Sequence, residues 1–267
     1  MLKQKKLKIE KIANEVYQRC LKNQYGINNI FDSLKLLDRK IELIRYPADE
    51  NLLGFIRYKK EDEVYIIYSN PNQVLSREIF TVAHEIGHCY LNHLAQKQFY
   101  NDYAKGKDDS LEIEANYFAA CLLLPKDILK EYLLENRIDV PFSKQDIACI
   151  MKEFNCSFEC VINRLNTLNY ISSEFRDDLI INKAQISIER LLKSIDGPAS
   201  LCQKSNDHIT FPNYYLKWII YNYNQRLISK EKLDLALKYM NISYDDIKDQ
   251  ISFKNEKIIE FEDYFNE

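Results

Sequence analysis

The chain of 267 residues carries 37 basic and 40 acidic side chains, and a net charge of -3 provides no strong field for nucleic acid or an anionic membrane. A hydrophobic content of 46% is enough to build a buried core, which is typical of a globular protein. The five glycines stand far apart, whereas Walker and Rossmann phosphate loops need several close together. Nucleotide chemistry by either route is therefore excluded.

The cellular setting is predicted from apolar runs and cysteines. No apolar run has the length of a signal peptide or a membrane span, so we expect a cytoplasmic protein without a membrane partner. The seven cysteines are an odd number and include no Cys-x-x-Cys pair. They fit a reducing compartment, in which cysteines serve as small buried hydrophobic side chains. The oligomeric state stays open.

The first part of the chain is predicted to combine helices with a small sheet. Apolar residues recur at helical spacing over residues 9–21, and a short helix is expected over 30–37. Enrichment in β-branched and aromatic residues indicates strands at 41–46, 53–58 and 64–68, the last two forming a hairpin.

The rest of the chain is predicted to be helical. Apolar residues at helical spacing place helices over residues 74–91, 111–124, 143–154 and 157–168. Pro125 ends the second of these because proline lacks the N–H that a helix interior requires. A polar loop is expected around 101–109, and the residues after 172 are predicted to be helical except for 197–212.

The segment that indicates chemistry is a His-Glu-x-x-His motif at residues 84–88. A spacing of four places His84 and His88 on one helix face, so both imidazoles reach one metal ion while Glu85 points toward the same cleft. Gly87 lies inside this helix, where glycine is disfavoured by about 1 kcal/mol relative to alanine. We therefore expect another backbone to approach closely beside His88.

A catalytic zinc takes three protein ligands and leaves one position for water, so the motif needs a third donor. A metzincin would place its third histidine where Leu94 stands, which excludes that class. His93 lies about 140° around the helix from His88. We expect it to face away from the metal, at the surface or as a partner of a ligand.

Two glutamates of the helix over residues 111–124 are candidates for the third ligand. Glu112 shares an apolar, small-residue face with Ala115 and Asn116, where a carboxylate is costly unless it is paired or binds metal. Asn116, one turn along, can hydrogen-bond a ligating histidine. Glu114 falls on a different stripe of the helix and stays open as the alternative.

Two segments of the chain resemble the ImmA/IrrE metallopeptidases, a gluzincin-like family. Residues 80–88 are similar to the signature helix of that family, and residues 112–125 are similar to its second motif. The segment from Phe154 to Leu168 is similar to the helical stretch that follows, so the resemblance covers roughly residues 10–170. The C-terminal third inherits no function from it.

The resemblance implies a zinc metallo-endopeptidase with His84, His88 and Glu112 as ligands, Glu112 standing four residues before Asn116. It also implies a protein substrate, namely a cognate helix-turn-helix repressor whose cleavage regulates genes of a mobile element or a stress response. The residues themselves predict the same chemistry, with Glu85 as the general base that takes a proton from a zinc-activated water. We expect an extended substrate segment to pair with the strand at 64–68.

These inferences predict an α+β fold that is mostly helical, with a small N-terminal three-stranded sheet packed on the helix of the His-Glu-x-x-His motif. We divide the chain into a zinc metallopeptidase domain at residues 1–140, a helix-turn-helix-like helical unit at 141–172 and a helical C-terminal region of unknown role at 173–267.

The competing interpretation is a DNA-binding or sensing regulator with a structural or vestigial metal site. Lys144, Lys152 and Arg164 of the helix-turn-helix-like unit are offset by three acidic residues, which argues against direct nucleic-acid binding. A structural zinc site would fill all four positions, often with cysteine, yet Cys89 is turned about 100° from His88 on the helix.

Overall fold

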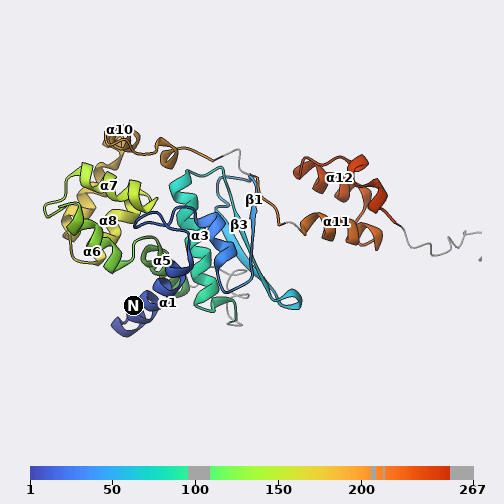
Figure 1. Cartoon of the computed structure of the whole chain (residues 1–267), viewed down its shortest axis with the longest axis horizontal. Helices are drawn as coiled ribbons and strands as arrows, with labels where there is room; N and C mark the ends of the chain where they lie inside the picture. The colour runs from blue at the N-terminus through green and yellow to red at the C-terminus, as the bar shows by residue number, and fades with distance from the viewer. Residues whose placement is uncertain (96–108, 206–208, 213, 253–267) are drawn as a thin grey trace, which may run out of the picture. The chain divides into compact units, whose positions relative to one another are not determined.

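The computed structural model describes residues 1–95, 109–205, 209–212 and 214–252 (Figure 1). The chain divides into two compact units, Met1–Thr210 and Phe211–Glu267. The predicted α+β fold is confirmed, since helices predominate and a three-stranded sheet lies in the N-terminal part. The loop predicted at 101–109 falls almost entirely outside the described residues, and the division by role into residues 1–140, 141–172 and 173–267 stays a prediction.

Two α-helices precede the three strands, and the other α-helices follow them. The strands are β1 (Ile41–Arg45), β2 (Gly54–Lys59) and β3 (Val64–Ser69). The α-helices of the first unit are α1 (Lys3–Arg19), α2 (Ile30–Ser33), α3 (Leu75–Tyr90), α5 (Asp109–Leu123), α6 (Lys126–Glu135), α7 (Lys144–Phe154), α8 (Phe158–Thr167), α9 (Ser173–Ile181) and α10 (Ile188–Lys193). Those of the second unit are α11 (Tyr215–Asn224) and α12 (Lys230–Tyr239).

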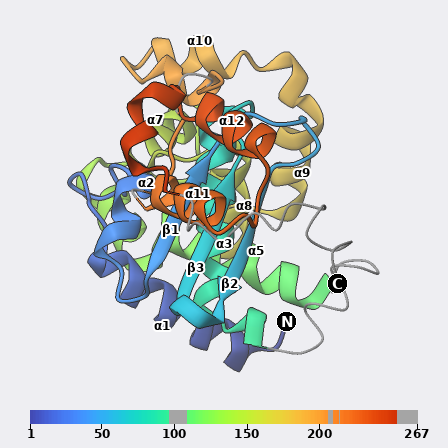
Figure 2. The same cartoon turned by 90° about the vertical axis from the view of Figure 1, so that its right-hand side faces the viewer.

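β3 is the central strand of the sheet (Figure 2). β1 pairs with it in parallel and β2 in antiparallel orientation, and Ile67 of β3 lies opposite Leu43 and Ile56, all three side chains being buried. The predicted hairpin of the last two strands is confirmed. The prediction that a substrate pairs with the strand at 64–68 is wrong, because neighbouring strands already occupy both of its edges.

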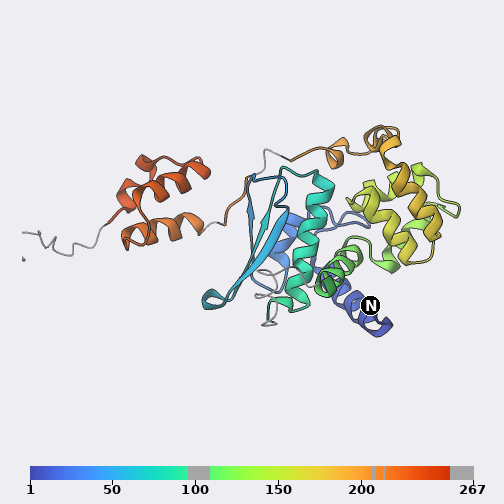
Figure 3. The ribbon, with the colours of Figure 1, turned by 180° about the vertical axis from the view of Figure 1, so that it is seen from behind.

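α3 lies between the sheet and α5 (Figures 1 and 3). Gly54 allows β2 to begin against this helix, because a Cβ there would lie 2.5 Å from Thr81 Cγ2. A Cβ at Gly87 would lie 3.2 Å from the carbonyl oxygen of Ala115 and 3.3 Å from its Cα. The close backbone approach predicted at Gly87 is therefore confirmed, and it holds α3 and α5 together where the candidate ligands lie.

The two helices with a helix-turn-helix outline, α7 and α8, pack into the first unit. Ser143 caps α7 in a capping box with Asp146, and Ser157 caps α8. The buried Arg164 of α8 donates its Nε–H to the carbonyl oxygen of Leu124, 3.0 Å away at the end of α5. A cation buried in this way is not accessible to a DNA phosphate.

A buried ion pair anchors the first turn of α3. Arg45, at the end of β1, donates two hydrogen bonds of 2.9 and 2.8 Å to the two carboxylate oxygens of Glu78. The hydroxyls of Ser69 and Ser205 donate to the same carboxylate at 2.8 and 2.6 Å. Glu78 is fully buried, so these four bonds replace the water it has lost.

Ser205 belongs to a segment that we call the strap, residues 203–210, of which 203–205 and 209–210 are described. The backbone N–H of Leu75 donates to the carbonyl oxygen of Gln203 at 2.8 Å, which ties the strap to the start of α3. Arg45 and Thr210 exchange two backbone hydrogen bonds of 2.8 and 2.9 Å. The strap therefore links β1 to the N-terminus of the helix that carries His84 and His88.

Replacing Arg45 with methionine is expected to lower the free energy of unfolding by about 3–5 kcal/mol, because it leaves the Glu78 carboxylate buried beside no positive charge. Chemical denaturation measures the loss. Arg57→Met, at an exposed position of β2, is the matched control and should change stability by about 0.5 kcal/mol or less. Removing both partners in Arg45→Met/Glu78→Leu should recover most of the loss, and a double variant as unstable as the single one would refute the explanation.

The second unit has a small core of its own. Helices α11 and α12 share a cluster of buried side chains, namely Ile220, Tyr223, Leu233, Leu237 and Ile247. Within the described ranges, no helix combines the length and apolar character needed to cross a bilayer.

Candidate metal centre

His84 and His88 of α3 and Glu112 of α5 bring their ligand atoms together. The two histidine Nε2 atoms lie 2.9 Å apart, and the Glu112 carboxylate oxygens lie 3.3 Å from that of His84 and 3.6 Å from that of His88. In the part of the chain that the structure describes, this is the group of histidine, cysteine and acidic side chains with ligand atoms close enough to share a metal ion. His84 and Glu112 remain partly exposed, so the cluster is accessible from solvent.

The spacing of these atoms fits a tetrahedral metal ion. Ligand atoms about 2.0–2.1 Å from a tetrahedral zinc lie about 3.3–3.4 Å from one another. The observed separations of 2.9, 3.3 and 3.6 Å bracket that value. Two imidazoles and one carboxylate form the donor set of open zinc sites, which leave a position for water. The residues present therefore fit a divalent metal ion of this kind.

Asn116 lies beside the outer ring nitrogen of His84. Its Oδ1 is 2.9 Å from His84 Nδ1, so the ring can donate from Nδ1 and keep the Nε2 lone pair for a metal. Glu112 and Asn116 occur one turn apart on the same face of α5, and each contacts the same histidine. The structure thus places the two residues that the sequence singled out on α5 against the same histidine.

Glu85 of α3 is buried, and its side chain lies next to the start of β2. Its side chain is 4% exposed, and Oε1 lies 3.8 Å from where a Cβ of Gly54 would be. Its negative charge contributes to the electrostatic environment of His84. Glu85 thus sits beside both a candidate ligand and an edge strand of the sheet.

His93 does not face away from the metal residues, so that part of the prediction is wrong, but its expected alternative role as a partner of a ligand agrees with its contact to His88. Its Nδ1 lies 2.9 Å from Nδ1 of His88, and its side chain is 1% exposed. The prediction extended helical rotation beyond the end of α3 at Tyr90, whereas Asn92 takes a left-handed φ of 57°. The chain turns there and directs His93 back toward His88.

Glu114, the alternative third ligand, faces His93 rather than the candidate metal position. One of its carboxylate oxygens lies 3.7 Å from His93 Nε2, and the other forms an ion pair with Lys5 of α1. Its side chain is buried, with 8% exposure. Sequence patterns did not reveal this pairing, because Lys5 and His93 are brought to Glu114 by tertiary packing.

Cys89 has no part in the cluster. Its side chain is fully buried, and burial raises the pKa of the thiol to about 12. Its sulfur lies 3.8 Å from Arg39, a cation that partly offsets this effect. A thiol held protonated in this way is a poor metal ligand.

The pKa of His84 is raised. Burial disfavours the charged ring, but the hydrogen bond to Glu112 and the charges of Glu85 and Glu112 outweigh that effect. Protons therefore compete with a metal ion for His84 Nε2 at higher pH than at an ordinary histidine, so metal binding weakens as pH falls through this pKa.

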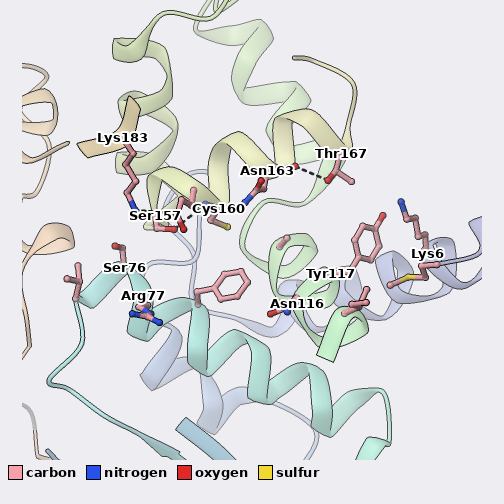
Figure 4. Close-up of a pocket in the computed structure, with 16 residues that line it drawn as sticks. Lys6, Ser76, Arg77, Asn116, Tyr117, Ser157, Cys160, Asn163, Thr167 and Lys183 are labelled. Carbon is pink, nitrogen blue, oxygen red and sulfur yellow. Dashed lines mark hydrogen bonds and ion pairs between the residues drawn. The ribbon is translucent and has the colours of Figure 1, made fainter. Parts of the chain in front are cut away.

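A groove with a volume of about 980 Å³ lies next to Asn116, and Figure 4 shows the side chains that line it. It lies between α3, α5 and α8, and its lining includes Arg77, Phe80, Asn116, Ala120, Cys160 and Asn163. Asn116 belongs to this lining and also contacts His84, so one side chain separates the groove from the candidate metal ligands. Glu159, another lining residue, is paired with Lys183 at 2.6 Å, whereas Arg77 has no acidic partner among the described residues.

Comparison with known proteins identifies the family. A profile of the IrrE N-terminal-like domain, a peptidase family, matches residues 37–166. The uncharacterized immunity region protein 2 of Bacillus phage phi105 is 30% identical over 131 residues, which are 49% of this chain and 77% of that protein. The chain belongs to the ImmA/IrrE family.

Two further proteins are similar to this ImmA/IrrE protein. The metallopeptidase ImmA of Bacillus subtilis (strain 168) is 29% identical over 124 residues, covering 46% of this chain and 69% of ImmA. A solved Mycobacterium tuberculosis transcriptional regulator matches with a TM-score of 0.40 and 17% identity, over 62% of this chain and 47% of that one. The chain thus spans about half the length of that regulator.

Proposed function

We propose that this ImmA/IrrE protein is a zinc-dependent endopeptidase. The observation that carries the proposal is the convergence of His84, His88 and Glu112 at distances that suit one tetrahedral ion, with Glu85 beside them. When bound, the ion supplies Lewis acidity to a water molecule and to the scissile carbonyl. The metallopeptidase name of the Bacillus subtilis relative supports the same reaction class.

Glu85 is the proposed general base. It accepts the proton of the attacking water and delivers it to the leaving amine, which is the role of the glutamate in His-Glu-x-x-His peptidases. Asn116 holds His84 by its Nδ1 and keeps the opposite nitrogen directed at the metal. A catalytic site has a use for Glu85, whereas a structural metal site has none.

We propose that the substrate is a protein, specifically a helix-turn-helix repressor encoded near this chain. An extended segment of it would pair with β2, whose outer edge carries no strand among the described residues and whose first residue, Gly54, lies beside Glu85. The rival function, DNA reading by α7 and α8, is disfavoured because Arg164 is buried and α8 lines the groove.

The proposed function is tested by mixing the purified full chain with the helix-turn-helix protein encoded beside it. We expect a specific cleavage, detected by intact-mass spectrometry, that stops when a chelator removes the metal and returns with Zn²⁺. Recovery with Mn²⁺ but not Zn²⁺ would make zinc the wrong ion. Cleavage that continues in chelator would contradict the metal mechanism.

The groove predicts a preference for substrate segments with a carboxylate. Arg77→Glu should reduce cleavage about tenfold or more, because it reverses the charge that meets an acidic side chain, and raising the salt concentration should weaken the wild-type preference. Cleavage rates for substrate variants with neutralised acidic residues measure the effect. Arg190→Glu, exposed on α10 and outside both the groove lining and the β2 edge, is the matched control. Equal rates for Arg77→Glu and the wild type would exclude this recognition.

A further inference from the structure

The outer nitrogens of the two candidate histidine ligands have different partners. His84 Nδ1 meets the amide oxygen of Asn116, which lies one turn from Glu112 on α5. His88 Nδ1 instead meets His93 Nδ1, a ring nitrogen that can either donate or accept. What His93 does for His88 therefore depends on which of its nitrogens carries the proton.

Ligation fixes that choice. His88 Nε2 faces His84 Nε2 and Glu112, so it must present a lone pair if it is to bind a metal there. The proton of a neutral His88 is then on Nδ1, which donates, and His93 Nδ1 accepts at 2.9 Å. His93 must in turn carry its proton on Nε2, the nitrogen that faces the Glu114 carboxylate at 3.7 Å.

The series of side-chain contacts continues from His93 through Glu114 to a cation at the surface. Glu114 is 8% exposed and pairs through its other oxygen with Lys5, whose side chain is about half exposed. Lys5 compensates the charge of a carboxylate that is otherwise buried, and the carboxylate favours an N–H on the facing nitrogen of His93. The contacts thus run from Lys5 through Glu114 and His93 to His88, and His93 is 1% exposed.

We infer that His93, Glu114 and Lys5 form a positioning chain that holds His88 in the tautomer and ring orientation required for metal binding. This inference rests on the proposed metal site and extends it to residues outside the His-Glu-x-x-His motif. His93 acts through His88 and does not contact the substrate or the ion. Glu114, two residues from Glu112 and on a different face of α5, supports the site without ligating it.

The test measures zinc affinity by competition with a chromophoric chelator. His93→Ala should weaken zinc binding about 10–100-fold, the usual effect of removing a partner of a ligating histidine. Asparagine places a carbonyl oxygen close to the position of His93 Nδ1, so His93→Asn should recover much of the affinity. His93→Leu fills the space without an acceptor and should not. If leucine restores affinity as well as asparagine does, His93 acts by packing alone and the inference is wrong.

The contributions of Glu114 and Lys5 are tested by a series of substitutions with graded expected effects on zinc binding. Glu114→Gln should weaken zinc binding less than His93→Ala does, and Lys5→Met less again, because each is one contact further from His88. Lys11→Met, exposed on the same helix as Lys5, is the matched control and should bind zinc like the wild type. A thermal melt of each variant separates weakened binding from loss of folding.

Histidine tautomers provide a readout independent of affinity. The chain has four histidines, so long-range ¹H–¹⁵N spectra of ¹⁵N-histidine-labelled protein are simple to assign. In the zinc-loaded wild type we expect His88 protonated at Nδ1 and His93 at Nε2. A proton on His93 Nδ1 would overturn the inference while leaving the metal site intact. Failure of the wild type to bind zinc would instead refute the proposed function.

Discussion

Glu85→Gln is expected to abolish measurable cleavage while zinc binding stays close to that of the wild type. Glutamine has nearly the same shape but cannot accept a proton from water, and general acid–base catalysis by such a group contributes about 10²–10⁴-fold. Because Glu85 is not among the three converging ligand atoms, its neutralisation leaves the donor set complete. The experiment measures turnover of the repressor and bound zinc in the same preparation.

Glu131→Gln is a suitable control for Glu85→Gln, since Glu131 is exposed on α6 and contacts neither ligand helix through a hydrogen bond or ion pair that the described structure contains. It should cleave at the wild-type rate. A Glu85→Gln protein that cleaves as fast as its parent would show that another group accepts the proton. Loss of zinc from Glu85→Gln would instead point to a ligand role for Glu85.

Glu112→Ala is expected to lose both the metal and the activity, since it removes the carboxylate that lies 3.3 and 3.6 Å from the two histidine Nε2 atoms. Two imidazoles alone bind zinc far more weakly than the three-ligand set. Zinc content after dialysis and cleavage after zinc addition are the measurements. The variant also removes the hydrogen bond that raises the pKa of His84, so residual metal binding should persist to lower pH.

The comparison with Glu114→Ala decides between the two glutamates that the sequence left open. The Glu114 variant should be active once zinc is supplied in excess, because its carboxylate faces His93 instead of the metal position. If Glu114→Ala were inactive at saturating zinc and Glu112→Ala active, the assignment of the third ligand would be reversed.

The candidate metal centre could be largely predicted from sequence because its residues follow helical geometry. Spacings of four place His84 with His88 and Glu112 with Asn116, and each pair shares a face whatever the rest of the chain does. Gly87 indicated that a second helix lies close by, and Ala115 of α5 fulfils that expectation.

The residues that sequence reasoning missed depend on geometry beyond one helix. The direction of the His93 side chain was predicted wrongly because the helix ends before it and Asn92 reverses the chain, although a partner of a ligand was one of the two roles expected for it. Lys5 reaches Glu114 only because α1 packs on α5. The central position of β3 in the sheet was missed for a related reason. A local pattern predicts a hairpin, but a parallel neighbour such as β1 is joined by no short turn and leaves no local signal.

The strap shows that the residues needed to support the candidate metal centre extend beyond the segment that matches the family. The family match stops at residue 166, yet the carboxylate of Glu78, in the first turn of the helix that carries both histidines, receives one of its hydrogen bonds from Ser205. A fragment cut at the family boundary would lack Ser205 and would leave β1 without its partner Thr210. The smallest autonomous peptidase fragment is therefore expected to extend through residue 210, and a chain cut at the family boundary would be a poor choice for assays of the isolated catalytic part.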